Sequence, residues 1–311
     1  SALPAPRSPG PRLLRGTLVY GRAGLKVAEF DTDYQTASGS RFDDTQTELG
    51  LNFGLGGEAP VSPNVSVRME YDYTMFDDYD MAVPPGTDTF TNNESGMWLG
   101  FVYNLQRTAP DPAATKPADF SGFYAGVQAG HGALLSNDTT GPRDAGSTLV
   151  ADFGDTGFTG GVFAGYNRQY DRWVFGGELD AELSDVAWDH ERDPTGRSFS
   201  LEKQYSVGAS LRAGYVVGQA ALLYARAGIV HSGFEYDFLR GMTAVNSDLG
   251  KTGLRLGMGM EMPVNEQLNV RLDFSHTDYG RETVFVPGPD NGNERFDMAE
   301  TLFRLGTAYR F

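Results

Sequence analysis

The stretch Val65-Ser-Val-Arg-Met-Glu-Tyr-Asp-Tyr-Thr-Met75 decides the fold, because its side chains alternate strictly in polarity. Apolar residues occupy the odd positions, and the even positions carry Arg68, Glu70 and Asp72 among small polar side chains. Successive side chains of a β-strand point to opposite faces of the sheet. The pattern therefore predicts a strand with one apolar face and one charged face.

The same alternation recurs along the whole chain of 311 residues. Short and long connections alternate between these segments, which is typical of an antiparallel up-and-down barrel. The twelve segments are 16–31, 45–56, 65–76, 95–106, 119–131, 156–169, 172–184, 203–217, 220–235, 252–262, 267–279 and 300–311. We therefore expect an all-β transmembrane antiparallel β-barrel. In the simplest arrangement, all twelve segments are strands of a single barrel.

A soluble β-sandwich or lipocalin-like barrel is the alternative, since its strands would turn the apolar face inward. Two features favour the membrane barrel. Large charged side chains alternate with many of the 40 glycines on the polar face, which suits a narrow interior and would only weaken a solvent-exposed strand. Aromatic residues also gather near the strand ends, as in the interfacial girdles of membrane barrels.

The composition excludes several classes of protein. The chain has no Cys, which excludes disulfide scaffolds, thiol catalysis and iron–sulfur clusters. It has 25 Lys and Arg against 41 Asp and Glu, so its net charge of −16 argues against a nucleic-acid partner. It has no apolar run of the roughly 18 residues that mark a transmembrane helix.

The beginning of the chain repeats its end. The segments 50–61 and 67–71 match 253–264 and 270–274 at a constant offset of 203 positions. Four predicted strands thus occur twice, so we expect a duplicated four-strand unit at 13–106 and an eight-strand unit at 119–311. A Pro-rich turn at 107–118 would join them on the periplasmic side, and 1–12 would be a flexible periplasmic segment.

Closure of these units admits three arrangements. Four strands alone would leave unpaired sheet edges in lipid, which is prohibitive. One barrel over 13–311 is therefore the simplest solution. A tethered half-barrel and an assembly of two copies into closed barrels are the alternatives.

The chain carries four motifs in order, Phe120-Ser-Gly-Phe-Tyr-Ala-Gly-Val-Gln-Ala-Gly130, Gly160-Gly-Val-Phe-Ala-Gly-Tyr-Asn167, Trp173-Val-Phe-Gly-Gly-Glu178 and Leu211-Arg-Ala-Gly-Tyr215. With them, 119–311 resembles the small outer-membrane immunogenic, porin-like β-barrel family of the OmpA-like membrane barrel superfamily. The chain departs from that family in its extra N-terminal strands and at Ser275-His276. The resemblance implies the outer membrane of a Gram-negative bacterium, with a signal peptide removed before Ser1, and it implies no single activity.

The ending Thr307-Ala-Tyr-Arg-Phe311 resembles the insertion signal of such barrels. It implies that Tyr309 and Phe311 are read by the barrel-insertion machinery. Other expected partners are outer-membrane lipid and lipopolysaccharide. The acidic loops at 32–44, 77–94 and 185–202 are expected either to bind lipopolysaccharide through divalent cations or a partner with basic patches, or to form only a solvated, charged surface. An envelope protein and a second copy of the chain are the remaining candidate partners. None of these loops has EF-hand spacing, so we expect no metal site.

Charged residues of the polar strand faces are expected to line the lumen. Charges inside a barrel persist only when they are paired or hydrated. The nearly equal numbers of cations and anions therefore predict either pairs beside a narrow water path or polar packing that fills the barrel. The candidate pore-lining residues are Arg22, Lys26, Glu48, Arg68, Glu70, Asp72, Glu178, Asp180, Glu182, Arg212, Arg226, Arg255, Glu261, Arg271, Asp273, Arg304 and Arg310.

These features predict a porin-like or structural outer-membrane protein with acidic extracellular loops, without cofactor or catalysis. A scaffold or partner-binding protein with a closed lumen is the alternative. An outer-membrane lipid hydrolase is a further alternative, but Ser275 and His276 are adjacent on a predicted strand and face opposite ways. They therefore cannot act on each other as nucleophile and base.

Overall fold

The computed structural model describes most of the predicted strands. The described residues are 17–35, 41–83, 86–90, 93–105, 117–140, 149–192, 197–218, 221–240, 243–286 and 292–311. The predicted N-terminal segment 1–12 and most of the predicted turn 107–118 lie outside them. Within the described ranges, no helix is both long enough and apolar enough to cross a membrane.

The first unit is an open, four-stranded antiparallel sheet, which we call the N-terminal sheet. Its strands stand in the order β1 (Leu18–Gln35), β2 (Arg41–Pro60), β3 (Val65–Met75) and β6 (Asn93–Tyr103). Between β3 and β6, strands β4 (Tyr79–Val83) and β5 (Gly86–Phe90) form a separate hairpin. The predicted alternation of 65–75 is thus realised as a strand inside this sheet.

The second unit is a closed barrel, which we call the C-terminal barrel. Its strands are β7 (Gly122–Thr140), β8 (Leu149–Tyr170), β9 (Trp173–Ser184), β10 (Ala187–Arg192), β11 (Arg197–Val217), β12 (Ala221–Arg240), β13 (Thr243–Pro263), β14 (Leu268–Val286) and β15 (Gly292–Arg310). Both β9 and β10 pair with β11, so they are successive pieces of one strand. The last strand returns to the first, with Arg304 opposite Gly130, which closes eight strands.

The expectation of one twelve-stranded barrel is therefore wrong, because the closed barrel has eight strands. Strands β6 and β15 are the two copies of one duplicated strand, so either of them could pair with β7. The edge of β7 is taken by β15. This pairing lets the strands of 119–311 satisfy their own backbone hydrogen bonds without opening the barrel to admit four more.

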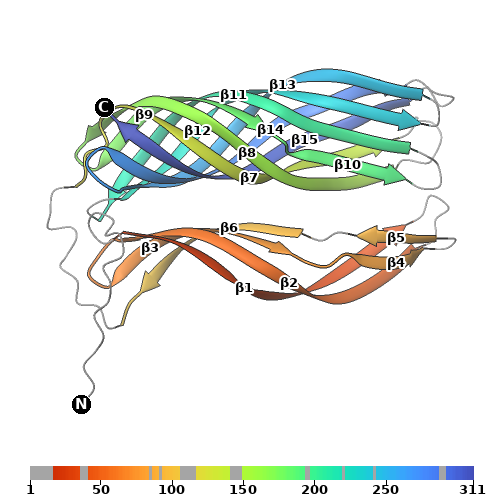
Figure 1. Ribbon diagram of the computed structural model, residues 1–311, viewed down its shortest axis with the longest axis horizontal. Coiled ribbons are helices and arrows are strands. Elements are labelled where there is room, and N and C mark those ends of the chain that lie inside the picture. Colours follow the sequence, from red (N-terminus) through yellow and green to blue (C-terminus); the bar gives the residue numbers. More distant parts are fainter. Residues whose placement is uncertain are drawn as a thin grey trace, which may run out of the picture.

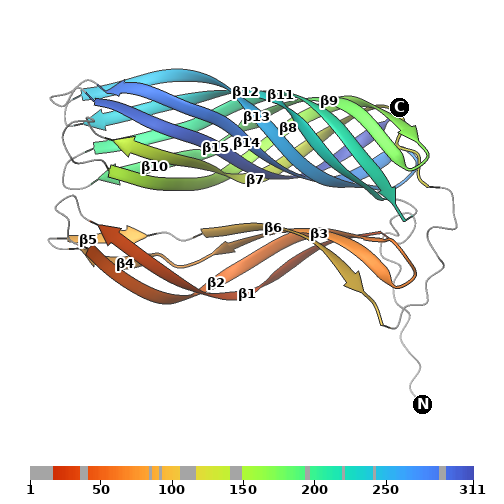
Figure 2. The same cartoon turned by 180° about the vertical axis from the view of Figure 1, so that it is seen from behind.

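The N-terminal sheet lies along the outside of the C-terminal barrel, with its long axis in the same direction (Figure 1). The view from behind shows the same arrangement (Figure 2). The β4–β5 hairpin and β10 lie at one end of the molecule, which we call the loop end, and the C-terminus lies at the other, which we call the turn end. The long connections of the N-terminal sheet therefore lie at the same end of the molecule as those of the C-terminal barrel.

Strand β3 makes the contact between the two units. Val67 and Met69 are 1% exposed and belong to a cluster with apolar residues of β12 to β15. Tyr71 stacks on Phe303 with ring centroids 4.4 Å apart, and its hydroxyl lies 3.0 Å from Nδ1 of His131. The apolar face predicted for 65–75 is therefore covered by protein over much of its length.

Removing the ring of Tyr71 should loosen this contact. Tyr71→Ala deletes the stacked pair with Phe303, and such a ring contact is worth about 0.5–1.5 kcal/mol. We expect faster hydrogen exchange in β3 with unchanged exchange in β14, measured by mass spectrometry in detergent or nanodiscs. Phe101→Ala is the control, since this ring is 77% exposed on β6. Unchanged exchange in Tyr71→Ala would contradict the contact.

Candidate functional site in the barrel interior

Two apolar layers lie inside the C-terminal barrel, one toward each end. The loop-end layer is formed by Leu134, Val186, Leu201, Phe234, Tyr236, Tyr279, Met298 and Leu302. The turn-end layer is formed by Phe120, Val174, Val216, Leu222 and Tyr224. All of these side chains are buried. Those of them that lie on strands have the inward parity of the charged residues between the layers, so both layers belong to the inner face of the barrel wall.

The space between the two layers holds charged side chains, which we call the ionic layer. It contains six cations and six carboxylates, and none of the twelve is more than 4% exposed. They are Lys203, Arg212, Arg226, Arg255, Arg271 and Arg304, with Glu178, Asp180, Glu182, Glu261, Asp273 and Glu300. The formal charges in the ionic layer therefore balance.

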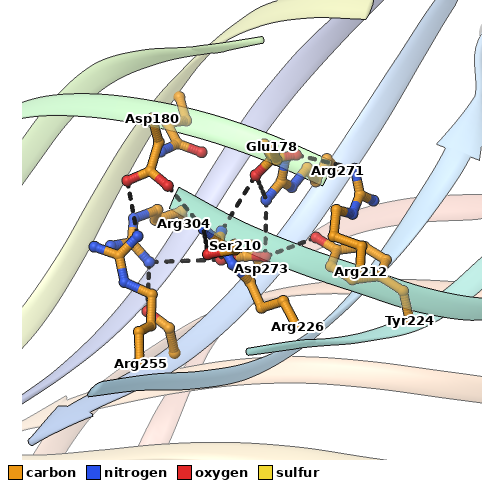
Figure 3. Close-up of polar contacts among 12 residues, drawn as sticks. Glu178, Asp180, Ser210, Arg212, Tyr224, Arg226, Arg255, Arg271, Asp273 and Arg304 are labelled. Atoms are coloured by element: carbon orange, nitrogen blue, oxygen red, sulfur yellow. Dashed lines mark hydrogen bonds and ion pairs between the residues drawn. The ribbon is translucent and has the colours of Figure 1, made fainter. Parts of the chain in front are cut away.

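Glu178 on β9 is a centre of the ionic layer (Figure 3). It accepts hydrogen bonds from both terminal nitrogens of Arg271 at 2.7 and 2.9 Å, and from Arg212 at 3.0 Å. Strands β9 and β14 are not neighbours in the barrel. The bonds from Arg271 to Glu178 thus cross the interior and tie one wall to another.

Asp273 on β14 is a second centre. It accepts hydrogen bonds from the Tyr224 hydroxyl at 2.7 Å, from Arg271 at 2.9 Å and from Arg226 at 3.2 Å. Arg226 also donates to Asp180 at 2.8 Å. The two centres therefore share arginines, so these contacts form one connected network rather than isolated pairs.

The part of the ionic layer nearer the loop end has the same character. Arg304 on β15 donates to both carboxylate oxygens of Glu182, at 2.5 and 2.9 Å. Lys203 on β11 forms a salt bridge with Glu300 on β15 at 2.5 Å. Tyr279 of the loop-end layer donates a hydrogen bond to Glu300 at 3.1 Å. Bonds from β15 to β9 and from β11 to β15 again join strands that do not pair with each other.

A glycine beside Tyr224 makes room for this packing. A Cβ atom at Gly259 would lie 2.2 Å from the Tyr224 hydroxyl. The N-terminal sheet repeats the arrangement, since a Cβ at Gly56 would lie 2.5 Å from the ring of Tyr20. Glycine on the polar face thus admits a large polar neighbour in both copies of the repeat.

The predicted pore-lining residues divide between the two units. Those placed in the ionic layer are Glu178, Asp180, Glu182, Arg212, Arg226, Arg255, Glu261, Arg271, Asp273 and Arg304. Those placed on the N-terminal sheet, outside the C-terminal barrel, are Arg22, Lys26, Glu48, Arg68, Glu70 and Asp72. Arg310 donates to the Glu266 carbonyl near the turn end and lies outside the ionic layer. A role in conduction stays a prediction for all of them.

Sequence reasoning missed Lys203 and Glu300 as interior residues. The register of β11 shifts at a bulge between Lys203 and Tyr205, so alternation counted back from Leu211 assigns Lys203 to the wrong face. Glu300, by contrast, has the same parity as Arg304 and could have been found by counting in twos. The insertion-signal residues Tyr309 and Phe311 form an edge-to-face pair at 5.3 Å, and their recognition stays a prediction.

Ser275 and His276 point to opposite sides of β14. Ser275 is buried and accepts a hydrogen bond from Arg304 at 2.7 Å. His276 is exposed, with Nδ1 2.9 Å from the Thr301 hydroxyl. Among the described residues no group of three or more His, Asp or Glu side chains could hold a metal ion.

Comparisons with known proteins find similar chains. A family model, the outer membrane protein beta-barrel domain, matches residues 7–104 and 108–311. The 31 kDa outer-membrane immunogenic protein of Brucella melitensis is 27% identical over 217 residues, 66% of this chain and 89% of that protein. The 22 kDa outer membrane protein of Rhizobium leguminosarum is 29% identical over 210 residues, 64% of this chain and 82% of that protein. The crystal structure of OprG from Pseudomonas aeruginosa is 16% identical, with a TM-score of 0.43 over 61% of this chain and 97% of its own.

Breaking one buried contact of the ionic layer should destabilise the folded barrel. Arg304→Met removes the partner of Glu182 and leaves a buried carboxylate with less compensation, a change that costs about 3–5 kcal/mol. We expect this loss in the free energy of unfolding, measured with urea in lipid vesicles. Arg281→Met is the control, because Arg281 pairs with Asp297 at 2.8 Å while 63% exposed, and an exposed pair contributes little.

A double substitution at a buried ion pair distinguishes the contribution of charge pairing from that of packing. Lys203→Met combined with Glu300→Gln removes both ends of a buried ion pair at once, and such replacements are often close to neutral. We expect the double variant to be more stable than Lys203→Met alone in the same assay. A double variant that is no more stable than the single one would argue against pairing between these two side chains.

Proposed function

Because this chain belongs to the outer membrane protein beta-barrel domain family, we propose that it is a structural protein of the Gram-negative outer membrane with a closed eight-stranded barrel. The outer-membrane location follows from the family and from relatives that are named as outer membrane proteins. In that membrane the barrel acts as a closed scaffold, in preference to the porin-like protein that the sequence also allows.

The filled interior is the observation that carries this proposal. A diffusion channel needs a hydrated path between its walls, whereas the twelve charges of the ionic layer are at most 4% exposed. They bond across the interior to one another, and an apolar layer lies toward each end. A small eight-stranded barrel is just wide enough for its own side chains to fill it. The ionic layer then serves to hold the walls together.

The same contacts argue against Ser275 and His276 as a nucleophile–base pair. A serine nucleophile needs a base within hydrogen-bond reach. Ser275 instead accepts a bond from Arg304, and His276 lies on the opposite face beside Thr301. The Ser275 hydroxyl is thus bonded into the barrel wall, on the face opposite the imidazole of His276.

Planar-bilayer recording tests the closed barrel. We expect full-length protein that shows the heat-modifiable gel mobility of a folded barrel to give no stepwise conductance through the C-terminal barrel. Arg226→Gln in the ionic layer and Arg22→Gln in the N-terminal sheet are matched variants at equivalent positions of the repeat. Conductance steps that change with Arg226→Gln, and not with Arg22→Gln, would contradict the proposal and support a porin.

A further inference from the structure

The N-terminal sheet has two open edges. Among the described residues, β1 pairs only with β2, and β6 pairs only with β3. The outer faces of these edge strands carry largely exposed apolar side chains, including Leu25 at 69% and Phe101 at 77% exposed. Such exposed apolar faces indicate that these strands contact lipid. Unpaired backbone N–H and C=O groups cost several kcal/mol each in lipid, so both edges need a partner strand.

The repeat shows where the missing strands belong. Strands β1, β2, β3 and β6 correspond to β12, β13, β14 and β15 of the C-terminal barrel. In the barrel, a Cβ at Gly228 on β12 would lie 2.2 Å from the backbone of β11, and one at Gly306 on β15 would lie 3.0 Å from the backbone of β7. A Cβ added at their counterparts, Gly24 and Gly100, would meet no described atom within 4 Å.

The charged face of the N-terminal sheet is incomplete in the same way. Arg22 bonds to Glu70 at 2.8 Å, much as Arg226 bonds to Asp273 at 3.2 Å in the barrel. The side chain of Arg22 is nevertheless 44% exposed, while that of Arg226 is fully buried. The difference arises because β9 covers Arg226 and supplies Asp180. Among the described residues, no strand covers Arg22 in the way that β9 covers Arg226.

From these features we propose that two copies of this chain join their N-terminal sheets into a second eight-stranded barrel. Each copy supplies four strands, and the repeat shows that this four-strand unit is half of an eight-stranded barrel. A second copy also brings a matching edge for each open edge. The dimer would thus hold three barrels, the shared one between two C-terminal barrels. This inference goes beyond the proposed function of the C-terminal barrel.

The direction of the strands fixes which edges meet. Strand β1 runs from the turn end to the loop end, and β6 runs back, as the shared orientation of the two units shows (Figure 1). Both copies must sit the same way up in the membrane, so a two-fold axis along the membrane normal relates them. Under this axis β1 is antiparallel to β6 of the other copy and parallel to its β1. Continuing the antiparallel meander therefore requires two β1–β6 seams.

Charges in the shared barrel can then pair between copies. The described polar face of one N-terminal sheet carries the cations Arg22, Lys26 and Arg68 and the carboxylates Asp44, Glu48, Glu58, Glu70, Asp72 and Glu94. Each copy thus has more carboxylates than cations. The half-exposed guanidinium groups of Arg22 and Arg68 would face carboxylates of the other copy, as arginines of the C-terminal barrel face carboxylates from strands across its interior.

Cysteine cross-linking tests the seam, because the chain has no Cys of its own. Two differently tagged full-length chains are co-expressed, one with Leu99→Cys on β6 and one with a cysteine at Ala23, Leu25 or Val27 on β1. These residues share the outward parity, and the three positions on β1 allow for an unknown stagger. We expect a disulfide between the two tagged chains for at least one pair. The matched control is Ile229→Cys with Leu305→Cys, the equivalent positions in the C-terminal barrel, and should give none.

The mass of the unmodified protein gives an independent outcome. Native mass spectrometry or light scattering in nanodiscs should find two chains of 33.8 kDa each. A single-chain mass would overturn the proposal, whatever the cross-links show. Cross-links between two β1 cysteines or two β6 cysteines, without any β1–β6 product, would overturn the seam. Neither result bears on conductance through the C-terminal barrel, so the two proposals fail separately.

Discussion

Backbone hydrogen bonding in lipid is the constraint on which the rest of this structure depends. A membrane offers no water to an unpaired N–H or C=O group, so a spanning sheet must close on itself. The eight strands of 119–311 meet this requirement within one chain, through the pairing of β15 with β7. Among the residues that the structure describes, the duplicated strands of the N-terminal sheet do not meet it, and their two open edges are the most informative feature of the molecule.

Closure of a small barrel also decides what its interior can be. Inward positions alternate with lipid-facing ones along every strand, so the interior can carry polar side chains while the exterior stays apolar. Here the inward residues form a balanced ionic layer that bonds across the barrel between two apolar layers. Bonds such as Arg271 to Glu178 join opposite walls of the barrel, as the proposed structural role requires.

Much of the fold and part of the site could be read from the alternation alone. It predicted the all-β membrane class, and the family match confirms the resemblance found in the motifs of 119–311. It also assigned Glu178, Arg226 and Asp273 to the inward face of their strands. It failed at Lys203, because a bulge shifts the register, and alternation cannot be followed through a bulge.

The sequence by itself determined the faces of each strand, the membrane environment and the duplication, because these depend on the local period of two and on direct comparison of segments. Only the tertiary structure decided how many strands close together. The copies β6 and β15 offer equivalent edges to β7, so no local pattern distinguishes eight strands from twelve. The choice depends on long-range pairing, which the closed barrel resolves in favour of β15.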